Sequence, residues 1–537
     1  MKPLFVLAVC TCLSITTAAQ AVFFKNINNT TATNLNTGTG IEFNGYRYFY
    51  ASKNFMEGTI WKTDGIPGNT VDFINSNDIN SADVVFIHNN ILYYNVTENG
   101  IPKSYKTDGN TKTLFLEPNA DIFSANLNQT AIASVGNNII LSLTSSTVGQ
   151  ELYISDGTTN NLTLLKDIRP GTANSLPNNF TPISNNKIVF TANDGTNGIE
   201  LWVTDGTTSG TQMVKDINPS GSSFISKLTS YNGKAYFALG NNIWETDGTE
   251  AGTQIFLNLR SDSSSEDPFY EFENELYFTA NDASFTAVDL WKTDGTVVGS
   301  TILASGFNYA DTFQRTNNYL FFAADTDASG YELWRTDGTP SGTFLTKDIN
   351  PGPEDSLVSN PSLGNGGDKL FFEATYYNDD VNIENAQSGE LWSSDGTPAG
   401  TLFNTTINPD GGQGEPDNFF NINNKLIFKA NADGNGNGTN QGINLWVVNT
   451  NALSLQENKR VSKLSIYPNP GSSTIHIAGP KEAIKHIKLI DVNGKVLHSV
   501  TSNFSKVDTR TLLTGIYFLI INFNDGKTET LKFIKNY

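Results

Sequence analysis

Two short segments of the sequence carry oxygen-bearing side chains at the alternate spacing that a hard cation requires. One has the pattern D-x-N-x-N-G and the other the pattern D-x-D-x-S-G. The side chains are Asp433, Asn435 and Asn437 in the first segment and Asp325, Asp327 and Ser329 in the second. Such a set can wrap a calcium ion. Position twelve of the first segment is Asn444 rather than a bidentate Glu, and hairpin turns favour the same residue types, so a plain turn is the alternative.

A loop between residues 376 and 388 is the second candidate site. It lengthens the interval between Trp334 and Trp392 to 58 residues. Its aromatic and acidic residues are Tyr376, Tyr377, Asp379, Asp380 and Glu384. Long loops on a rigid scaffold are where binding residues tend to gather. We therefore expect this loop to bind a ligand, either a glycan or another surface protein.

Other catalytic chemistry has few residues to use. The chain has four histidines and two cysteines, and both cysteines lie near the start, at Cys10 and Cys12. His88 is the one histidine between residues 22 and 450, and we expect it to be a surface residue beside a turn. No Ser-His-Asp set and no thiol nucleophile can be assembled there. Two carboxylates suffice for a glycoside hydrolase or lyase, so a carboxylate-dependent enzyme stays an alternative.

A repeat positions these residues and fills most of the chain. An aromatic strand recurs nine times, and in most copies it runs into an Asp-Gly or Asp-Gly-Thr turn, as in Glu332 to Thr339. The first and last anchors are 385 residues apart over eight intervals, or about 48 residues per repeat, as in four-stranded propeller blades. The anchors are Trp61, Tyr105, Tyr153, Trp202, Trp244, Trp291, Trp334, Trp392 and Trp446. Asp-Gly follows in eight of them, at Asp64, Asp108, Asp156, Asp205, Asp247, Asp294, Asp337 and Asp395.

Each repeat reads as four short strands with Gly, Asn, Asp or Pro in every gap. A single four-stranded sheet cannot cover its own apolar faces, and stacking the units in a closed ring covers them. We predict an all-β fold in which residues 22–450 form a β-propeller of about nine four-stranded repeats, with eight or nine blades. A β-solenoid is the alternative, although repeats of this length are long for one coil.

The repeated residues themselves are best explained as scaffold. One tryptophan or tyrosine per repeat at a strand position is expected to fill the space between blades. One aspartate per repeat is expected to accept hydrogen bonds from backbone N–H groups of its own turn, while the next glycine takes a positive φ. A ligand site should therefore be sought where the repeat is interrupted.

The two ends of the chain differ from the repeat array. Residues 1–21 read as a secretory signal peptide, because Lys2 precedes an apolar run and Ala19-Gln20-Ala21 offers a cleavage site. The formal net charge is −20, which disfavours nucleic acid and anionic membranes as partners. Residues 451–461 are a polar linker, and residues 462–537 are basic. Short alternating strands in this last part predict a small C-terminal β-sandwich. We expect no transmembrane segment in the mature chain.

Two family resemblances rest on these motifs. Glu200 to Thr207, Glu332 to Thr339 and Glu390 to Thr397 match the ELWxxDGT repeat of large secreted bacterial proteins in full. This resemblance implies an architecture and no assigned activity. The C-terminal part resembles the type IX secretion sorting domain of Bacteroidota, through Tyr467-Pro468-Asn469-Pro470, Ile490 to Val496 and Leu513 to Phe518. That resemblance implies the type IX machinery as a partner, then release or attachment at the cell surface.

Together these features predict a secreted or cell-surface propeller that acts as a binding, adhesion or interaction scaffold. A carbohydrate-active enzyme and a structural surface-layer component are the alternatives. The composition requires no cofactor, and calcium is the only metal that the sequence suggests.

Overall fold

The computed structural model describes most of the repeat array and most of the C-terminal part. The described residues are 21–25, 40–52, 58–74, 79–119, 121–122, 127–259, 269–281, 286–364, 367–376, 387–405, 407, 414–431, 443–449, 465–467, 473–478, 484–491, 495–502, 504–523 and 528–535. Contacts divide the chain into two compact units, Met1–Leu453 and Ser454–Tyr537. The predicted signal peptide and linker lie outside the described residues, apart from Ala21.

Within the described residues, the first unit contains nine four-stranded antiparallel sheets, which we number as blades 1 to 9. Blades 1 to 3 consist of β2 (Ile41–Phe43), β3 (Tyr46–Ser52), β4 (Gly58–Thr63) and β5 (Val71–Asp72); β6 (Ile79–His88), β7 (Ile91–Glu98), β8 (Ile101–Thr107) and β9 (Lys112–Leu116); and β10 (Ile132–Val135), β11 (Asn138–Ser145), β12 (Gly149–Ser155) and β13 (Thr163–Lys166). Blades 4 to 6 consist of β14 (Asn178–Ile183), β15 (Lys187–Asn193), β16 (Ile199–Thr204) and β17 (Gln212–Lys215); β18 (Ser226–Tyr231), β19 (Lys234–Leu239), β20 (Asn242–Thr246) and β21 (Gln254–Leu257); and β22 (Tyr270–Phe272), β23 (Glu275–Asn281), β24 (Val288–Thr293) and β25 (Thr301–Phe307). Blades 7 and 8 consist of β26 (Tyr309–Arg315), β27 (Leu320–Thr326), β28 (Gly330–Thr336) and β29 (Phe344–Lys347); and β30 (Ser359–Leu363), β31 (Leu370–Tyr376), β32 (Gln387–Ser394) and β33 (Leu402–Thr405).

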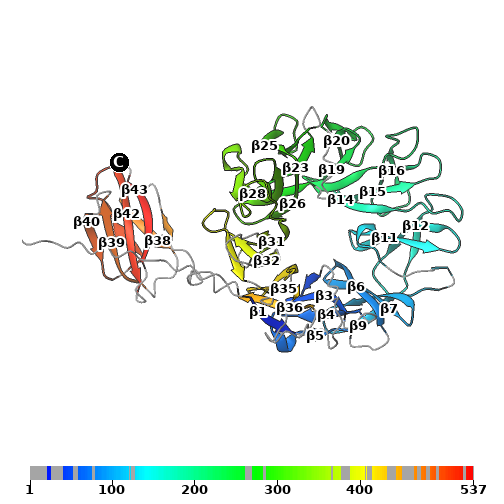
Figure 1. The fold of residues 1–537 in the computed structure, drawn as a ribbon, viewed down its shortest axis with the longest axis horizontal. Coiled ribbons are helices and arrows are strands. Elements are labelled where there is room, and N and C mark those ends of the chain that lie inside the picture. Colours follow the sequence, from blue (N-terminus) through cyan, green and yellow to red (C-terminus); the bar gives the residue numbers. More distant parts are fainter. Residues whose placement is uncertain are drawn as a thin grey trace, which may run out of the picture. The chain divides into compact units, whose positions relative to one another are not determined.

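Blade 9 joins the two ends of the array. It consists of β34 (Asp417–Ile422), β35 (Lys425–Asn431), β36 (Ile443–Asn449) and the N-terminal strand β1 (Ala21–Lys25). β1 pairs antiparallel with β36, with Ala21 opposite Val448 and Phe23 opposite Trp446. Figure 1 shows the blue β1 beside β36, where the ring closes. The first and last repeats thus share one sheet, so the array holds nine blades rather than eight.

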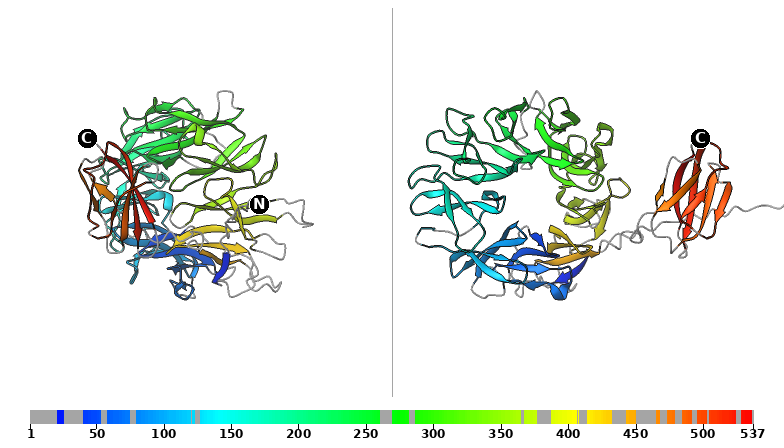
Figure 2. Two further views of the ribbon diagram at one scale, coloured as in Figure 1. Left: turned by 90° about the vertical axis from the view of Figure 1, so that its left-hand side faces the viewer. Right: turned by 180° about the vertical axis from the view of Figure 1, so that it is seen from behind.

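The nine sheets form a ring, as both faces of the propeller show (Figures 1 and 2). The first strands of successive blades contact one another, for example β26 with β30 and β30 with β34, so these strands are innermost. The helices of the described residues are three single turns of 3₁₀ helix, η1 (Pro67–Asn69), η2 (Gln129–Ala131) and η3 (Pro340–Gly342). None of them has the length and hydrophobicity that crossing a bilayer requires. The predicted all-β propeller is confirmed.

The aromatic anchors pack between neighbouring blades, as predicted. Trp202 of blade 4 lies in one buried cluster with Leu165 and Ile168 of blade 3. Trp392 of blade 8 does the same with Ile349 of blade 7. Each sheet therefore buries its apolar face against the next sheet, and the tryptophans are core residues rather than exposed platforms.

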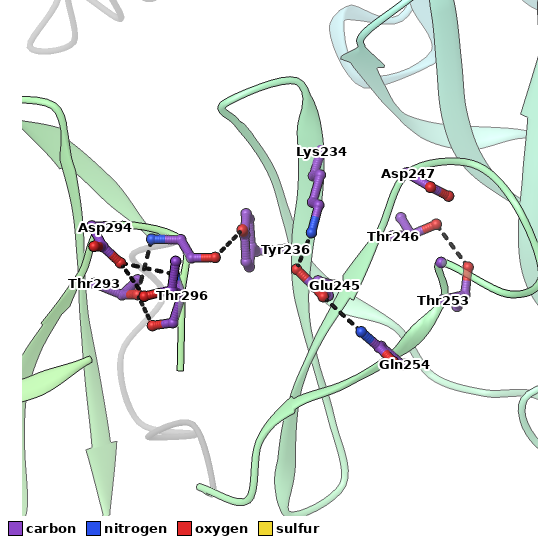
Figure 3. A network of polar contacts seen from close by, with 12 residues as sticks. Lys234, Tyr236, Glu245, Thr246, Asp247, Thr253, Gln254, Thr293, Asp294 and Thr296 are labelled. Atoms are coloured by element: carbon purple, nitrogen blue, oxygen red, sulfur yellow. Dashed lines mark hydrogen bonds and ion pairs between the residues drawn. The ribbon is translucent and has the colours of Figure 1, made fainter. Parts of the chain in front are cut away.

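The Asp-Gly-Thr segments are turns that their own side chains stabilise (Figure 3). Asp294 Oδ1 accepts hydrogen bonds from the backbone N–H of Thr296 at 2.8 Å and from its hydroxyl at 2.7 Å. These bonds stabilise the charged form and lower the pKa of the Asp294 carboxyl. In the neighbouring blade, the hydroxyls of Thr246 and Thr253 lie 2.7 Å apart and tie the two sides of the equivalent turn together.

Glycine is required at one position of this turn and is favoured at a second. Gly338, directly after Asp337, has a φ of +87°, which side-chain-bearing residues rarely adopt. Gly342 has an ordinary φ, but an added Cβ would lie 1.9 Å from Asp337 Oδ1. The carboxylate thus occupies the space of a side chain in blade 7, whereas blades 1 and 3 have Asn69 and Asn161 at this position, and Asn69 Nδ2 donates a hydrogen bond to Asp64 Oδ2 at 2.7 Å.

The glutamate of the repeat has a role that the sequence did not indicate. Glu332 is fully buried, and its Oε1 accepts a hydrogen bond from the backbone N–H of Asn350 at 2.9 Å. Glu390 Oε2 accepts from Ile407 N–H at 2.9 Å, in the same position of the next blade. Each glutamate thus fixes the connection that leaves its blade. Burial raises the pKa of both carboxyls to about 7.

The second unit is a two-layer β-sandwich, as predicted. One layer contains β37 (Ser465–Tyr467), β38 (Thr474–Ala478) and β41 (Lys506–Asp508). The other contains β39 (Ile484–Asp491), β40 (Val496–Val500), β42 (Gly515–Phe523) and β43 (Thr528–Lys535). Ile475 of the first layer packs in one buried cluster with Leu519 and Phe533 of the second. The sequence predicts strands over residues 474–477, 487–491, 495–498, 516–522 and 528–534, which correspond to β38, β39, β40, β42 and β43, and it does not predict the short β37 and β41.

The closing strand provides a test of the ring. Phe24 is 5% exposed and packs between blades 9 and 1, whereas the adjacent Phe23 is 42% exposed. We expect Phe24→Ala to lower the free energy of unfolding by about 3–5 kcal/mol, because it leaves a cavity at the closing interface. Phe23→Ala should lower the free energy of unfolding by about 1 kcal/mol, because it removes the edge-to-face contact with Trp446. Denaturant unfolding of both variants checks this, and equal losses would argue that β1 does not close the ring.

Glu332 gives a prediction for pH. Its folded pKa is raised above the ordinary value, so its contribution to stability is full below about pH 4.5 and is lost as the pH rises through about 7. Glu332→Gln does not titrate. The stability of the native protein relative to this variant should therefore fall between pH 5 and pH 8, by at most about 3 kcal/mol at roughly 1.4 kcal/mol per pKa unit.

The matched control is Glu354→Gln, since Glu354 is exposed in the connection between blades 7 and 8. Unfolding midpoints measured from pH 5 to pH 8 would show a pH-dependent gap for Glu332→Gln and none for the control. Parallel curves for Glu332→Gln and the native protein would contradict the assignment.

Candidate functional site

The innermost strands of several blades share a β-bulge, and a polar residue lies at that bulge. In blades 4, 5, 7, 8 and 9 the pairing of the first two strands slips by one residue near the start of the inner strand. The residue at the bulge has a positive φ in blades 4, 7, 8 and 9: Asn179, Thr312, Asn360 and Asn418. Bulges re-aim side chains and are common next to binding sites. The repeat thus places a polar residue, Asn in three blades and Thr in one, at the same inner position.

A cavity lies where two of these bulges meet blade 1. Its volume is about 190 Å³. Blade 8 contributes Asn360, Pro361 and Ser362, blade 9 contributes Asn418, Phe419, Phe420 and Leu445, and blade 1 contributes Gly40, Arg47 and Phe49. Phe49, Phe420 and Leu445 are buried and form an apolar floor. Residues that are more than 300 positions apart in sequence line one cavity, because the ring closes between blades 9 and 1.

Arg47 is the cation of this cavity. Its guanidinium carbon lies 5.5 Å from the centre of the Phe420 ring, a cation–π contact. Its Nε is buried without a hydrogen-bond partner, and within the described ranges the guanidinium forms no ion pair. Burial lowers the pKa of Arg47, and the nearby charge of Glu42 opposes that shift only in part.

Carboxylates behind the cavity hold its amide side chains. Glu373 Oε2 accepts hydrogen bonds from Asn360 Nδ2 at 2.8 Å and from Ser359 Oγ at 2.9 Å. Burial raises the pKa of Glu373, and the charges of Asp417 and Glu415 raise it further. Asp417 pairs with Lys429 at 2.8 Å, yet burial raises its pKa more than that ammonium lowers it. Neither Glu373 nor Asp417 lines the cavity, so both act by positioning other groups.

The predicted binding loop is described only at its two ends, Tyr376 and residues 387–388. Tyr376 ends β31, is 39% exposed, and makes an edge contact with Trp392 at 6.2 Å between ring centres. Tyr377, Asp379, Asp380 and Glu384 lie outside the described residues. Tyr376 and Glu373 belong to the same strand, so the predicted loop leaves the blade that contributes Asn360 to the cavity.

The two predicted calcium segments are also described unequally. Asp433, Asn435 and Asn437 lie outside the described residues. Asp325, Asp327 and Ser329 lie in and after β27, at the hairpin to β28. Asp327 Oδ1 accepts a hydrogen bond from Asn308 Nδ2 at 2.9 Å, and the Ser329 hydroxyl lies 2.8 Å from that of Thr326. In the described part of the chain, no three His, Cys, Asp or Glu side chains are grouped to hold a metal.

The expectation that His88 is a surface residue is wrong. His88 is 5% exposed, and its ring nitrogens contact Ser134 Oγ at 2.7 Å and the Asn137 carbonyl at 3.1 Å. Both partners belong to the next blade, which the local sequence around His88 could not show. It borders a cavity of about 260 Å³ that the turn residues Asp108 and Asp156 also line. We assign His88 to the packing between blades 2 and 3.

Arg47 was not among the site residues predicted from the sequence, although a comparison of the repeats identifies it as an exception. Arg47 stands two positions before Phe49, the strand partner of the Trp61 anchor. The other eight blades have an aliphatic residue there, fully or almost fully buried. These residues are Leu92, Ile139, Ile188, Ala235, Leu276, Leu320, Leu370 and Leu426. Aligning the second strands as well as the anchors would have revealed the exception.

Comparison with solved structures finds matches at low identity. PorZ, an essential bacterial surface component of the type-IX secretion system of Porphyromonas gingivalis, is 13% identical over 92% of this chain and 69% of its own, with a TM-score of 0.32. Prolyl oligopeptidase B from Galerina marginata is 11% identical over 66% of this chain, with a TM-score of 0.36. This chain covers 57% of that peptidase. At these TM-scores none of the likenesses bears on activity.

Comparison at the level of sequence locates one domain. No curated protein matches the chain. Residues 465–536 match the family model described as the secretion system C-terminal sorting domain. The match coincides with the second compact unit and its β-sandwich. The C-terminal domain is therefore a type IX secretion sorting domain, and it directs the protein to the cell surface or the extracellular space.

Proposed function

We propose that the protein is a binding module of the cell surface, and that its propeller holds a small polar ligand, such as part of a glycan, in the cavity between blades 1, 8 and 9. The cavity itself carries the proposal. It is built where the side chains depart from the repeat, and it combines an apolar floor with convergent amides and one cation. A concave, mostly apolar site with a few placed polar groups is the usual form of a ligand pocket.

The support for this site comes from its construction. Asn360 donates to Glu373, which fixes the amide before any ligand arrives. Holding a polar group in place in advance lowers the cost of ordering it on binding. Tyr376, where the predicted loop begins, ends a strand of the same blade as Asn360.

The proposed function also includes export of the protein to the cell surface. Residues 1–21 act as a signal peptide, and the C-terminal domain engages the type IX machinery. The repeat belongs with the ELWxxDGT proteins of Bacteroidota, which is supported by the Glu, Trp, Asp, Gly and Thr positions that recur along the chain.

A carboxylate-dependent hydrolase or lyase is the second candidate. Glu373 and Asp417 favour it, because both hold side chains of the cavity through hydrogen bonds and burial raises both pKa values. A group with such a pKa can act as a general acid. Turnover of a polysaccharide that Glu373→Gln abolishes would establish this candidate over the binding module. Self-association of the protein without ligand binding would instead favour a surface-layer role.

A glycan array with the secreted protein, followed by affinity measurement, tests the binding proposal. We expect Asn360→Ala to weaken binding of the retained glycan about two- to tenfold, the worth of one neutral hydrogen bond. Asn179→Ala is the control, because Asn179 occupies the same bulge in blade 4, away from the cavity. No retained glycan, or equal effects of both substitutions, would argue against this site.

Calcium binding by the Asp433 and Asp325 segments is a further part of the proposal. A ligand present at a hundred times its Kd stabilises the folded state by about 2.7 kcal/mol. Calcium should therefore raise the unfolding temperature of the native protein relative to a chelator, and Asp433→Ala or Asp327→Ala should reduce that rise. The control is Asp194→Ala. Asp194 accepts backbone hydrogen bonds in the matching hairpin of blade 4, so its loss should act equally with and without calcium.

A further inference from the structure

Arg47 occupies a core position of the repeat. The equivalent residue of the other eight blades is Leu, Ile or Ala, and none of these is more than 1% exposed. A leucine at this position would be buried at no electrostatic cost. Blade 1 instead places there the side chain that is hardest to remove from water. Arg47 departs from the residue pattern of the repeat and has no pairing partner among the described residues. Functional residues are expected at positions of this kind.

The described residues provide no ion-pair or hydrogen-bond partner for the guanidinium of Arg47. Among the described residues it has neither a carboxylate partner nor a hydrogen-bond acceptor, and its Nε is fully shielded. The Phe420 ring beneath it offers a cation–π contact but accepts none of its five N–H groups. Gly40 packs directly on it, since an added Cβ there would lie 2.7 Å from Nε. Gly40 thus shields Nε, while Arg47 as a whole is partly exposed and lines the wall of the cavity.

We infer that the cavity recognises a carboxylate-bearing sugar, a uronic acid, whose carboxylate pairs with the guanidinium of Arg47. This inference rests on the proposed function, that the cavity holds a ligand. A planar guanidinium matches the two oxygens of a carboxylate, and the pairing is strengthened where water is excluded. The apolar floor of Phe49 and Phe420 suits the C–H face of a sugar ring, while Asn360, Asn418 and Ser362 supply partners for its hydroxyls.

Size and charge narrow the ligand class. The cavity, at about 190 Å³, is smaller than the roughly 300–1,000 Å³ of pockets for drug-sized ligands, so it holds one ring of a chain. The protein has a net charge of −20, which opposes anions in general. A singly charged carboxylate meets less of that repulsion than a doubly charged phosphate. A uronic acid therefore fits better than a sugar phosphate.

Affinity measurements with matched sugars test the inference. The probes are galacturonate against galactose and glucuronate against glucose, together with galactose 1-phosphate and N-acetylglutamate. We expect the native protein to prefer a uronate to its neutral counterpart. Arg47→Leu, which restores the residue of the other blades, should weaken uronate binding about tenfold to a hundredfold, because a hydrogen bond to a charged group is lost. It should also raise the unfolding temperature, since an unpartnered buried donor is removed.

Arg47→Lys separates charge from geometry. It keeps the cation but loses the fork of donors, so uronate binding should fall by less than in Arg47→Leu. Asn179→Ala, in the equivalent bulge of blade 4, should leave the preference unchanged.

The possible outcomes distinguish the uronic acid inference from the proposed binding function. Uronate and neutral sugar bound equally, or uronate binding unchanged in Arg47→Leu, would overturn this inference and leave the binding module standing. Stronger binding of the phosphate or of N-acetylglutamate would overturn the ligand class. Binding of none of the probes, with no glycan retained on the array, would overturn both. A lower unfolding temperature in Arg47→Leu with unchanged binding would show that Arg47 is structural.

Discussion

Each sheet of the propeller has two apolar faces, and each face is covered by the sheet beside it. This mutual burial is the constraint on which the rest of the structure depends, because no blade has a core of its own. The tryptophan anchors lie at these interfaces, as Trp202 does against blade 3. Such an arrangement has no free face only when the ring is closed, which here requires β1 to join β36.

Polar groups then fix the distance and angle between blades. The aspartate of each turn organises the turn itself, and the glutamate of the full motif reaches the connection that follows its blade, as Glu332 does at Asn350. Both devices use buried or self-contained hydrogen bonds that need no partner outside the protein. The most regular carboxylates of the sequence are therefore occupied by structure. The residues left for recognition are those that break the pattern, and Arg47 breaks it at a position that is aliphatic and buried in the other eight blades.

The sequence predicted what is local and periodic. Strand order, turn chemistry and the role of the tryptophans follow from a period of about 48 residues, and the structure bears them out. The Glu332 contact spans eighteen residues and the partners of His88 lie in the next blade, so local patterns contain no trace of either. The cavity joins Arg47 with Asn360 and Asn418. These segments are far apart in sequence and meet only because the ring closes. The repeat pattern by itself therefore does not predict that they line one cavity.

The shared ninth blade has a consequence for folding. Phe23 pairs with Trp446, so the last sheet forms only after almost the whole array has been made and has curved around on itself. Contacts between such distant segments are slow to form, because the chain must lose the entropy of a long loop before they contribute. Until then β36 has an open edge, and an unpaired edge strand is a template for aggregation. A chain cut short before β34 could arrange eight sheets and would still leave β1 without its partner, so ring closure acts as a check that the array is complete.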